Sequence, residues 1–158
     1  MKAIETALSL TQAYKLGIER FEKMLGDEFS KAIELMNKTN EHIIICGMGK
    51  SGLVGRKISS TLASTGTPSI FLHPAEAIHG DLGKVQKKSI VLLISYSGET
   101  EEIIALIPAF KRLNVTIVAL TGVKDSTLAS KADIILDTSV DREACPLNLA
   151  PTTSTMIT

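Results

Sequence analysis

The sequence has 158 residues, 44% of them hydrophobic and only 4% aromatic, so we expect one ordinary domain with an aliphatic core. Lys and Arg (17) balance Asp and Glu (17), and a formal net charge of zero argues against nucleic acid or an anionic membrane surface as a partner. No apolar run approaches the roughly 18 residues of a membrane span, and the charged start lacks the pattern of a signal peptide.

The first 40 residues predict helical structure. Apolar residues recur there at about 3.6-residue spacing, which places them on one helix face. They are Ile4, Ala7, Leu8, Tyr14, Ile18, Phe21 and Leu25. The pair Gly26-Asp27 interrupts the pattern, so we expect two helices in residues 1–40, preceding an α/β core in residues 41–158.

After residue 40, short runs rich in Ile, Val and Leu no longer alternate with polar residues, which is typical of parallel strands buried on both faces. The predicted strands are His42–Cys46, Ser69–Leu72, Ser89–Ser95, Val115–Leu120 and Asp133–Leu136, and the predicted helices between them are Ser51–Thr65, Thr100–Leu113 and Ser126–Lys131. This alternation predicts a doubly wound, flavodoxin-like α/β/α sandwich of about five parallel strands. Its ligands should bind at the carboxyl edge of the sheet.

The stretch "GMGKSG" (residues 47–52) follows a predicted strand and matches two nucleotide motifs. A dinucleotide fold needs an acidic residue roughly 20 positions later, but the next strand ends Phe71-Leu72-His73-Pro74. A P-loop needs glycine five residues before Gly49, and position 44 is Ile. What remains is a helix N-terminus suited to an anion, or glycines that merely allow close helix–strand packing.

The stretch "SYSGETEE" (residues 95–102) also joins a strand to a helix. Its hydroxyls at Ser95, Ser97 and Thr100 surround Gly98 beside a helix N-terminus, which favours a phosphate cradle. Alternatively, they cap the helix, and the three glutamates of this stretch complement its dipole. Carboxylates repel a phosphate, so we expect at least one of them to have a chemical role.

Two later stretches contain ionisable residues. His73 and His79 share the stretch "HPAEAIHGDLG" and are candidate proton shuttles, or else ordinary polar contacts. Arg142 and Glu143 follow the last predicted strand and are either site residues or solvated charges.

The two cysteines are far apart, with no C-x-x-C spacing. We therefore expect Cys46 and Cys145 to be reduced thiols in a cytoplasmic protein. Residues 151–158 resemble the beginning of a helix, because proline can open a helix and threonine or serine can cap one.

Together, "GMGKSG", "STGTPSIFLHPAEAIHGDLG", "SYSGET" and "EACPLNLAPTTST" closely resemble the sugar isomerase (SIS) domain of bacterial D-arabinose 5-phosphate isomerases, over about residues 40–158. The resemblance implies an aldose–ketose isomerase that interconverts D-ribulose 5-phosphate and D-arabinose 5-phosphate through an enediol. Its product would supply 3-deoxy-D-manno-octulosonate (KDO) synthesis for lipopolysaccharide or capsule. It also implies no cofactor, and a homo-tetramer with sites at subunit interfaces.

Carried over by position, the family's catalytic residues fall on Lys50, His79, Glu102 and Glu143. Its substrate-binding positions fall on Ser51, Gly66, Thr67, His73, Ser95, Ser97, Gly98 and Thr100, and His73 also matches a zinc contact that turnover does not require. Such enzymes usually continue into tandem cystathionine-β-synthase-type domains, after a further His in the linking segment. We therefore expect a single SIS domain, residues 1–158, truncated within its last helix. Another SIS isomerase, such as phosphoheptose isomerase, or a non-catalytic sugar-phosphate sensor remain alternatives.

Overall fold

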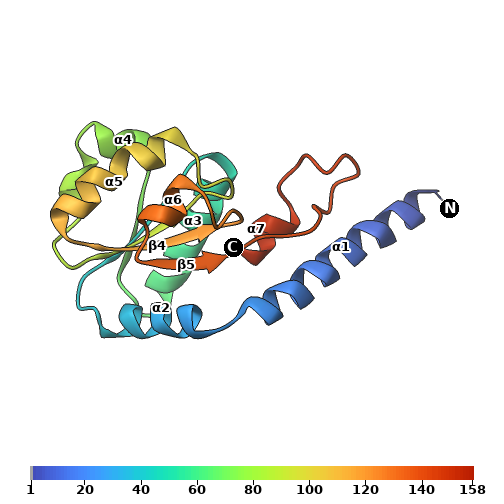
Figure 1. Ribbon diagram of the computed structural model, residues 1–158, viewed down its shortest axis with the longest axis horizontal. Coiled ribbons are helices and arrows are strands. Elements are labelled where there is room, and N and C mark those ends of the chain that lie inside the picture. The colour runs from blue at the N-terminus through green and yellow to red at the C-terminus, as the bar shows by residue number, and fades with distance from the viewer. Residues whose placement is uncertain (1) are drawn as a thin grey trace.

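The computed structural model describes residues 2–158, which form a parallel sheet between two layers of helices, with one long helix reaching out from them (Figure 1). The helices are α1 (Lys2–Met24), α2 (Asp27–Lys38), α3 (Gly49–Ser64), α4 (Pro74–Ile78), α5 (Glu101–Leu113), α6 (Thr127–Lys131) and α7 (Thr153–Ile157), with a 3₁₀ turn η1 (Asp81–Lys84). The strands are β1 (Ile43–Gly47), β2 (Ser69–Leu72), β3 (Ile90–Ile94), β4 (Thr116–Thr121) and β5 (Ile134–Asp137).

The sheet has the strand order β2-β1-β3-β4-β5, and all of its pairings are parallel. The chain winds from β1 out to β2 and then returns past β1 to β3, so β1 and β3 are the neighbours at which the winding reverses. The predicted doubly wound fold is therefore confirmed. In such folds, ligands bind in the crevice outside the carboxyl ends of the strands at this reversal.

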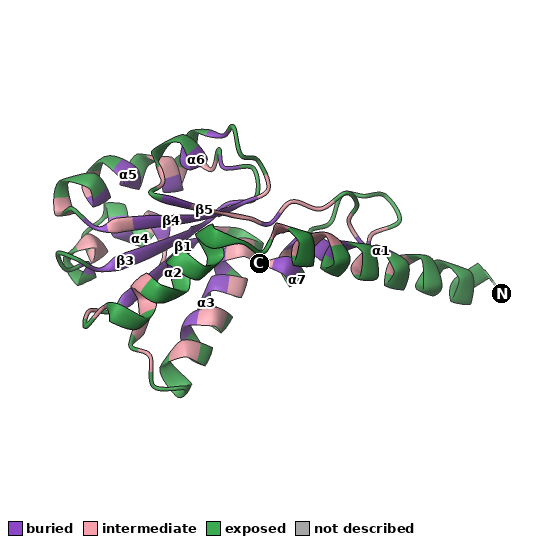
Figure 2. Cartoon of the chain, turned by 60° about the horizontal axis from the view of Figure 1, so that its bottom comes forward, coloured by how far each residue is buried: buried purple, intermediate pink, exposed green. Residues whose placement is uncertain are grey.

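Figure 2 shows β1, β3 and β4 buried within the fold. Alternating side chains of the strands build two separate cores, one on each face of the sheet. On one face, Ile44 packs with Phe110 of α5 and Leu128 of α6. On the other face, Ile45 packs with Ala32 of α2 and with side chains of α3. Because β1 and β3 are buried along their whole length, the apolar runs that predicted a parallel sheet have no polar face.

The predicted elements agree with the observed ones to within about two residues at each end. The break after the first helix lies at Gly26, as expected. Helix α3 begins at Gly49, earlier than the predicted Ser51, because Gly49 adopts a φ of +55° and lets the chain turn directly from β1 into the helix. Helix α4 and η1 were not predicted, since four or five residues are too few to show a helical period.

Helix α1 buries small residues and leaves much of its apolar stripe exposed. The predicted apolar residues Ile4 and Leu8 are 67% and 64% exposed, whereas Ala13 and Gly17 are buried. Gly17 lies so close to α7 that a Cβ placed on it would be 2.3 Å from Cγ2 of Thr153. The first turns of this stripe therefore lie exposed, while Tyr14 and Phe21 further along it are half-buried. No helix in residues 2–158 combines the length and the apolar character needed to cross a membrane.

Candidate functional site

Two helices begin at the point where the sheet reverses its winding. Helix α3 follows β1 and helix α5 follows the adjacent β3, so both N-termini lie at the same crevice, one on each face of the sheet. Main-chain N–H groups in their first turns have no acceptor within residues 2–158. These groups belong to Lys50, Ser51, Glu101 and Glu102. Unpaired N–H groups at the positive ends of two helix dipoles make this crevice suited to an anion.

The serine loop, residues 95–100, is held partly by its own hydroxyls. The Oγ of Ser95 lies 2.7 Å from Oγ1 of Thr100 and accepts a hydrogen bond from the N–H of Gly98 at 3.1 Å. The Oγ of Ser97 accepts from the N–H of Glu99 at 3.2 Å. Ser95 is only 2% exposed, so it shapes the loop, whereas Ser97 is exposed and Thr100 half-buried. The predicted cradle therefore has two accessible hydroxyls.

Helix α6 fixes the tip of the serine loop. Gly98 has a φ of +67°, and a Cβ placed on it would lie 2.0 Å from Oγ of Ser126. The N–H of Leu128 donates to the Gly98 carbonyl at 3.0 Å. The N–H of Thr127 donates to Oε1 of Glu99 at 2.6 Å, and this hydrogen bond lowers the pKa of the Glu99 carboxyl. Glu99 thus caps the start of α6.

The remaining carboxylates of this stretch differ in burial. Glu102 is half-buried in the first turn of α5, whereas Glu101 beside it is exposed. Lys50 is exposed in the first turn of α3. These residues therefore lie on the two helix N-termini that flank the crevice.

A cavity of about 310 Å³ opens beside the crevice, on the face of the sheet that carries α3. Its walls come from four parts of the chain: the start of α3, the serine loop, the segment that follows β5, and helix α7. Among the residues that line it are Ser51, Tyr96, Arg142, Glu143, Ser154 and Thr155. The structure therefore brings Ser51 and Glu143, which are far apart in sequence, to one hollow.

Glu143 is fully engaged with the start of α7. Its Oε2 accepts hydrogen bonds from the N–H and Oγ1 of Thr152 at 2.8 and 3.0 Å, and from the N–H of Ser154 at 3.2 Å. Its Oε1 accepts from the Ser154 hydroxyl. Burial raises the pKa of this carboxyl, but the hydrogen bonds from Ser154 and Thr152 outweigh burial and lower it. A catalytic role for Glu143 stays a prediction.

Arg142 is an exposed cation on the wall of the cavity. Of its neighbours, Asp141 pairs with Arg20 of α1 at 2.8 Å, and Glu143 is engaged by α7. No carboxylate within residues 2–158 forms an ion pair with Arg142. Its charge therefore remains available to a ligand.

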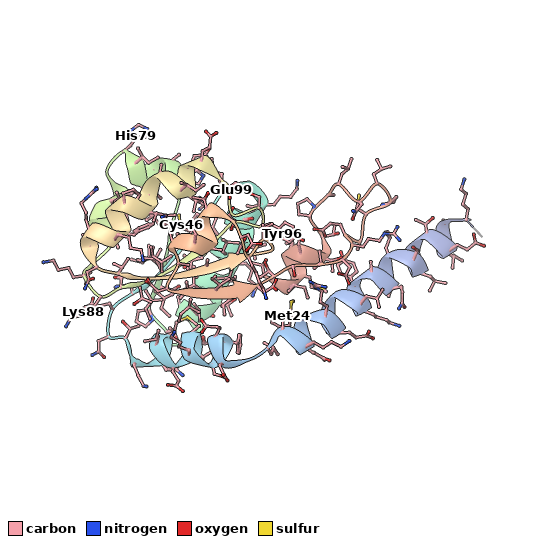
Figure 3. All side chains as sticks on the ribbon, in the orientation of Figure 1. Met24, Cys46, His79, Lys88, Tyr96 and Glu99 are labelled. Carbon is pink, nitrogen blue, oxygen red and sulfur yellow. The ribbon has the colours of Figure 1, made fainter. Side chains whose placement is uncertain are left out.

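Other predicted site residues lie outside this cavity. Gly66 and Thr67 precede β2 and so lie at the opposite, amino edge of the sheet. His79 is exposed and projects from the end of α4, away from Tyr96 and Glu99 (Figure 3). Sequence reasoning about the serine loop did not single out Tyr96, because nothing in its neighbourhood along the chain indicates where its ring points.

His73 is the predicted metal contact and follows β2 at the carboxyl edge. Its Nδ1 is buried without a hydrogen-bond partner in residues 2–158. No group of three His, Cys, Asp or Glu side chains in the described part of the chain is placed to hold a metal ion. A metal role for His73 stays a prediction.

Residues 35–158 match the SIS domain family. The chain is 55% identical over 134 residues to arabinose 5-phosphate isomerase KdsD of Pseudomonas aeruginosa, a match that covers 85% of this chain and 41% of that protein. It is 48% identical over 139 residues to arabinose 5-phosphate isomerase GutQ of Salmonella typhi, covering 88% of this chain and 43% of that one. The chain thus spans less than half the length of these curated relatives.

Solved structures share the fold. A Listeria monocytogenes protein superposes with a TM-score of 0.93 at 33% identity, covering 98% of this chain and 82% of that one. The Escherichia coli CFT073 protein c3406, solved in complex with arabinose 5-phosphate, gives a TM-score of 0.83 at 37% identity, covering 96% and 82% of the two chains.

Proposed function

This chain belongs to the SIS domain family, and we propose that its protein interconverts D-ribulose 5-phosphate and D-arabinose 5-phosphate. Relatives at 55% and 48% identity are named for this activity. The observation that carries the proposal is the crevice between the N-termini of α3 and α5, whose unpaired N–H groups suit a phosphate. The hydroxyls of Ser97 and Thr100 add uncharged donors to it.

In the proposed complex, the phosphate occupies the crevice and the sugar extends into the neighbouring cavity of about 310 Å³. Holding the phosphate fixes one end of the substrate, so that binding energy positions the reacting carbons. Arg142 on the cavity wall attracts the doubly charged substrate.

The reaction moves the carbonyl group from C2 to C1 of the sugar. A base removes a proton from C1 of the ketose while the C2 carbonyl oxygen takes up a proton, which gives the enediol. C2 is then protonated as the C1 hydroxyl loses its proton, which leaves the C1 aldehyde. Two carboxylates are candidates for the base: Glu102, at the crevice in the first turn of α5, and Glu143, on the wall of the cavity. Lys50, at the start of α3, stabilises the oxygen on which negative charge develops.

The residues left outside the cavity support sites shared between subunits. Gly66, Thr67 and His79 lie apart from the serine loop within one chain, and the apolar residues Ile4 and Leu8 of α1 are exposed. We propose that copies of the chain pack through α1 into a homo-tetramer that completes each site. Light scattering should give a tetramer for the intact protein and a smaller species for the double variant Ile4→Glu/Leu8→Glu. A monomeric wild type would overturn this part of the proposal.

The proposed product, D-arabinose 5-phosphate, would feed the synthesis of 3-deoxy-D-manno-octulosonate. Sugar phosphates of this kind belong to cytoplasmic metabolism, and the free thiols Cys46 and Cys145 agree with a reducing compartment. We therefore propose a cytoplasmic location.

The decisive experiment incubates the intact protein with D-ribulose 5-phosphate and identifies the aldose by NMR. D-arabinose 5-phosphate is expected, and sedoheptulose 7-phosphate should remain unchanged. Lys50→Met should abolish turnover, whereas Lys57→Met, on the exposed side of the same helix, should retain it. Binding of D-arabinose 5-phosphate without turnover would instead identify a sugar-phosphate sensor.

A further inference from the structure

Tyr96 connects three strand ends at the candidate site. It follows β3, and its carbonyl accepts hydrogen bonds from the N–H of Gly122 at 2.9 Å and from Oγ1 of Thr121 at 3.1 Å, at the end of β4. Its phenol oxygen accepts a hydrogen bond from the N–H of Val140, beyond β5, at 3.3 Å. The side chain thus reaches from the serine loop across the end of β4 (Figure 3).

The position of the Tyr96 ring depends on the absence of a side chain at Gly122. A Cβ placed on Gly122 would lie 2.5 Å from Cε2 of the ring and 2.7 Å from Cζ. Any larger residue at position 122 would therefore displace the ring. The glycine is needed here for space, and it fixes the direction in which the phenol points.

The Tyr96 phenol has an unused donor. A tyrosine oxygen offers one O–H donor and two lone pairs. One lone pair accepts from Val140, and the O–H has no acceptor in the described part of the chain. The side chain is 38% exposed and lines the cavity of about 310 Å³.

The cavity lies on the opposite face of the sheet from α5. Ser51 and Val54 of α3 and Ile94 of β3 line it together with Tyr96, while α5 contributes none of the described lining residues. The crevice therefore holds the unpaired N–H groups at the starts of α3 and α5, whereas the Tyr96 phenol lines the cavity. Tyr96 is therefore placed to contact the sugar, whereas the N–H groups at the crevice are placed to contact the phosphate.

We propose that Tyr96 is a further substrate-binding and specificity-determining residue, whose O–H donates a hydrogen bond to a hydroxyl group of the sugar chain. This inference rests on the proposed function, because it requires a sugar phosphate in the crevice and cavity. Val140 and Gly122 act as positioning residues for the phenol.

The test measures binding of two probes, D-arabinose 5-phosphate and inorganic phosphate, to the intact protein by calorimetry. Tyr96→Phe keeps the ring and removes the O–H. One hydrogen bond to a neutral partner corresponds to roughly a 5-fold loss of affinity. We expect that loss for D-arabinose 5-phosphate, no change for phosphate, and a raised KM with kcat retained. Tyr14→Phe, the same change on α1, should leave the affinity for both probes unchanged.

Gly122→Ala provides a second variant that leaves the phenol intact but moves it. Gly122→Ala should weaken the binding of D-arabinose 5-phosphate at least as much as Tyr96→Phe does. In a Tyr96→Ala background it should cause no further loss of affinity, because the ring that it displaces is then absent. If Tyr96→Phe lost equal affinity for both probes, Tyr96 would only stabilise the serine loop and would not contact the sugar. Unchanged affinity for the sugar phosphate would overturn the inference. A wild type that binds phosphate but no D-arabinose 5-phosphate would overturn the proposed function itself.

Discussion

The carboxylate of Glu143 accepts hydrogen bonds from both the hydroxyl and the main-chain N–H of Ser154, the latter at 3.2 Å. Two further hydrogen bonds come from Thr152, just before α7. A helix of five residues cannot satisfy its first N–H groups internally, so an external acceptor is needed to form it. Glu143 supplies that acceptor, and α7 in turn packs on Gly17 of α1.

This arrangement predicts a pH-dependent contribution to stability. The Glu143 pKa in the folded state lies below its ordinary value of 4.5, so the carboxylate stabilises the fold above that value and loses its effect as the pH falls through the folded pKa. Glu143→Gln should lower the free energy of unfolding by about 1 kcal/mol at pH 7. Urea unfolding should show the difference from wild type shrinking towards zero as the solution is acidified below pH 4.5. A constant difference at every pH would contradict the assignment.

The contact between α1 and α7 predicts a clash that a second substitution should relieve. Gly17→Ala places a Cβ 2.3 Å from Cγ2 of Thr153, and overpacking of this kind costs about 1–3 kcal/mol. Thr153→Ser removes Cγ2 but keeps the hydroxyl that accepts from the N–H of Ala144. The double variant should therefore be more stable in urea than Gly17→Ala alone. Additive losses would mean that the two residues are not in contact.

Adjacent glutamates on α5 give a matched test of Glu102 as the base. Glu102 is half-buried and Glu101 exposed, within the same helical turn. Glu102→Gln should reduce kcat at least about 100-fold, since general base catalysis contributes at least that much, whereas Glu101→Gln should stay within about twofold of wild type. Steady-state kinetics with D-ribulose 5-phosphate measure both variants. Near-normal kcat in Glu102→Gln would place the base elsewhere.

The two thiols should differ sharply in reactivity. Burial raises the pKa of Cys46 to about 12, while the main-chain N–H groups of Ala150, Leu149 and Leu147 lower the pKa of Cys145. Ellman's reagent at pH 7 should therefore modify Cys145 in the native protein and reach Cys46 only after unfolding. Cys145→Ser should abolish the reaction of the native protein with the reagent, and Cys46→Ser should leave that reaction unchanged. If a second thiol reacted rapidly with Ellman's reagent in the native protein, β1, which carries Cys46, would have to open to solvent.

Much of the fold could be predicted from local sequence. The apolar run of residues 43–46 indicated a strand buried on both faces, Gly26 indicated a break between helices, and Ser126 capped α6 as serine commonly does. The expectation that strand-end loops meet at one edge also held for the serine loop and the start of α3. Each of these signals depends on residues within a few positions of one another, or on the regular direction of parallel strands.

The sequence by itself therefore determined the strands, the longer helices, the parallel sheet and the edge at which we expect an anion to bind, because periodicity and helix-capping residues act locally. Only the tertiary structure decided that Glu99 and Glu143 are engaged by α6 and α7, that Tyr96 reaches Val140, and that α1 packs on α7 through Gly17. Arg20 and Asp141, for example, pair across 121 positions of the chain. The packing of the layers determines which distant residues pair. The local sequence around Arg20 or Asp141 therefore cannot predict their ion pair.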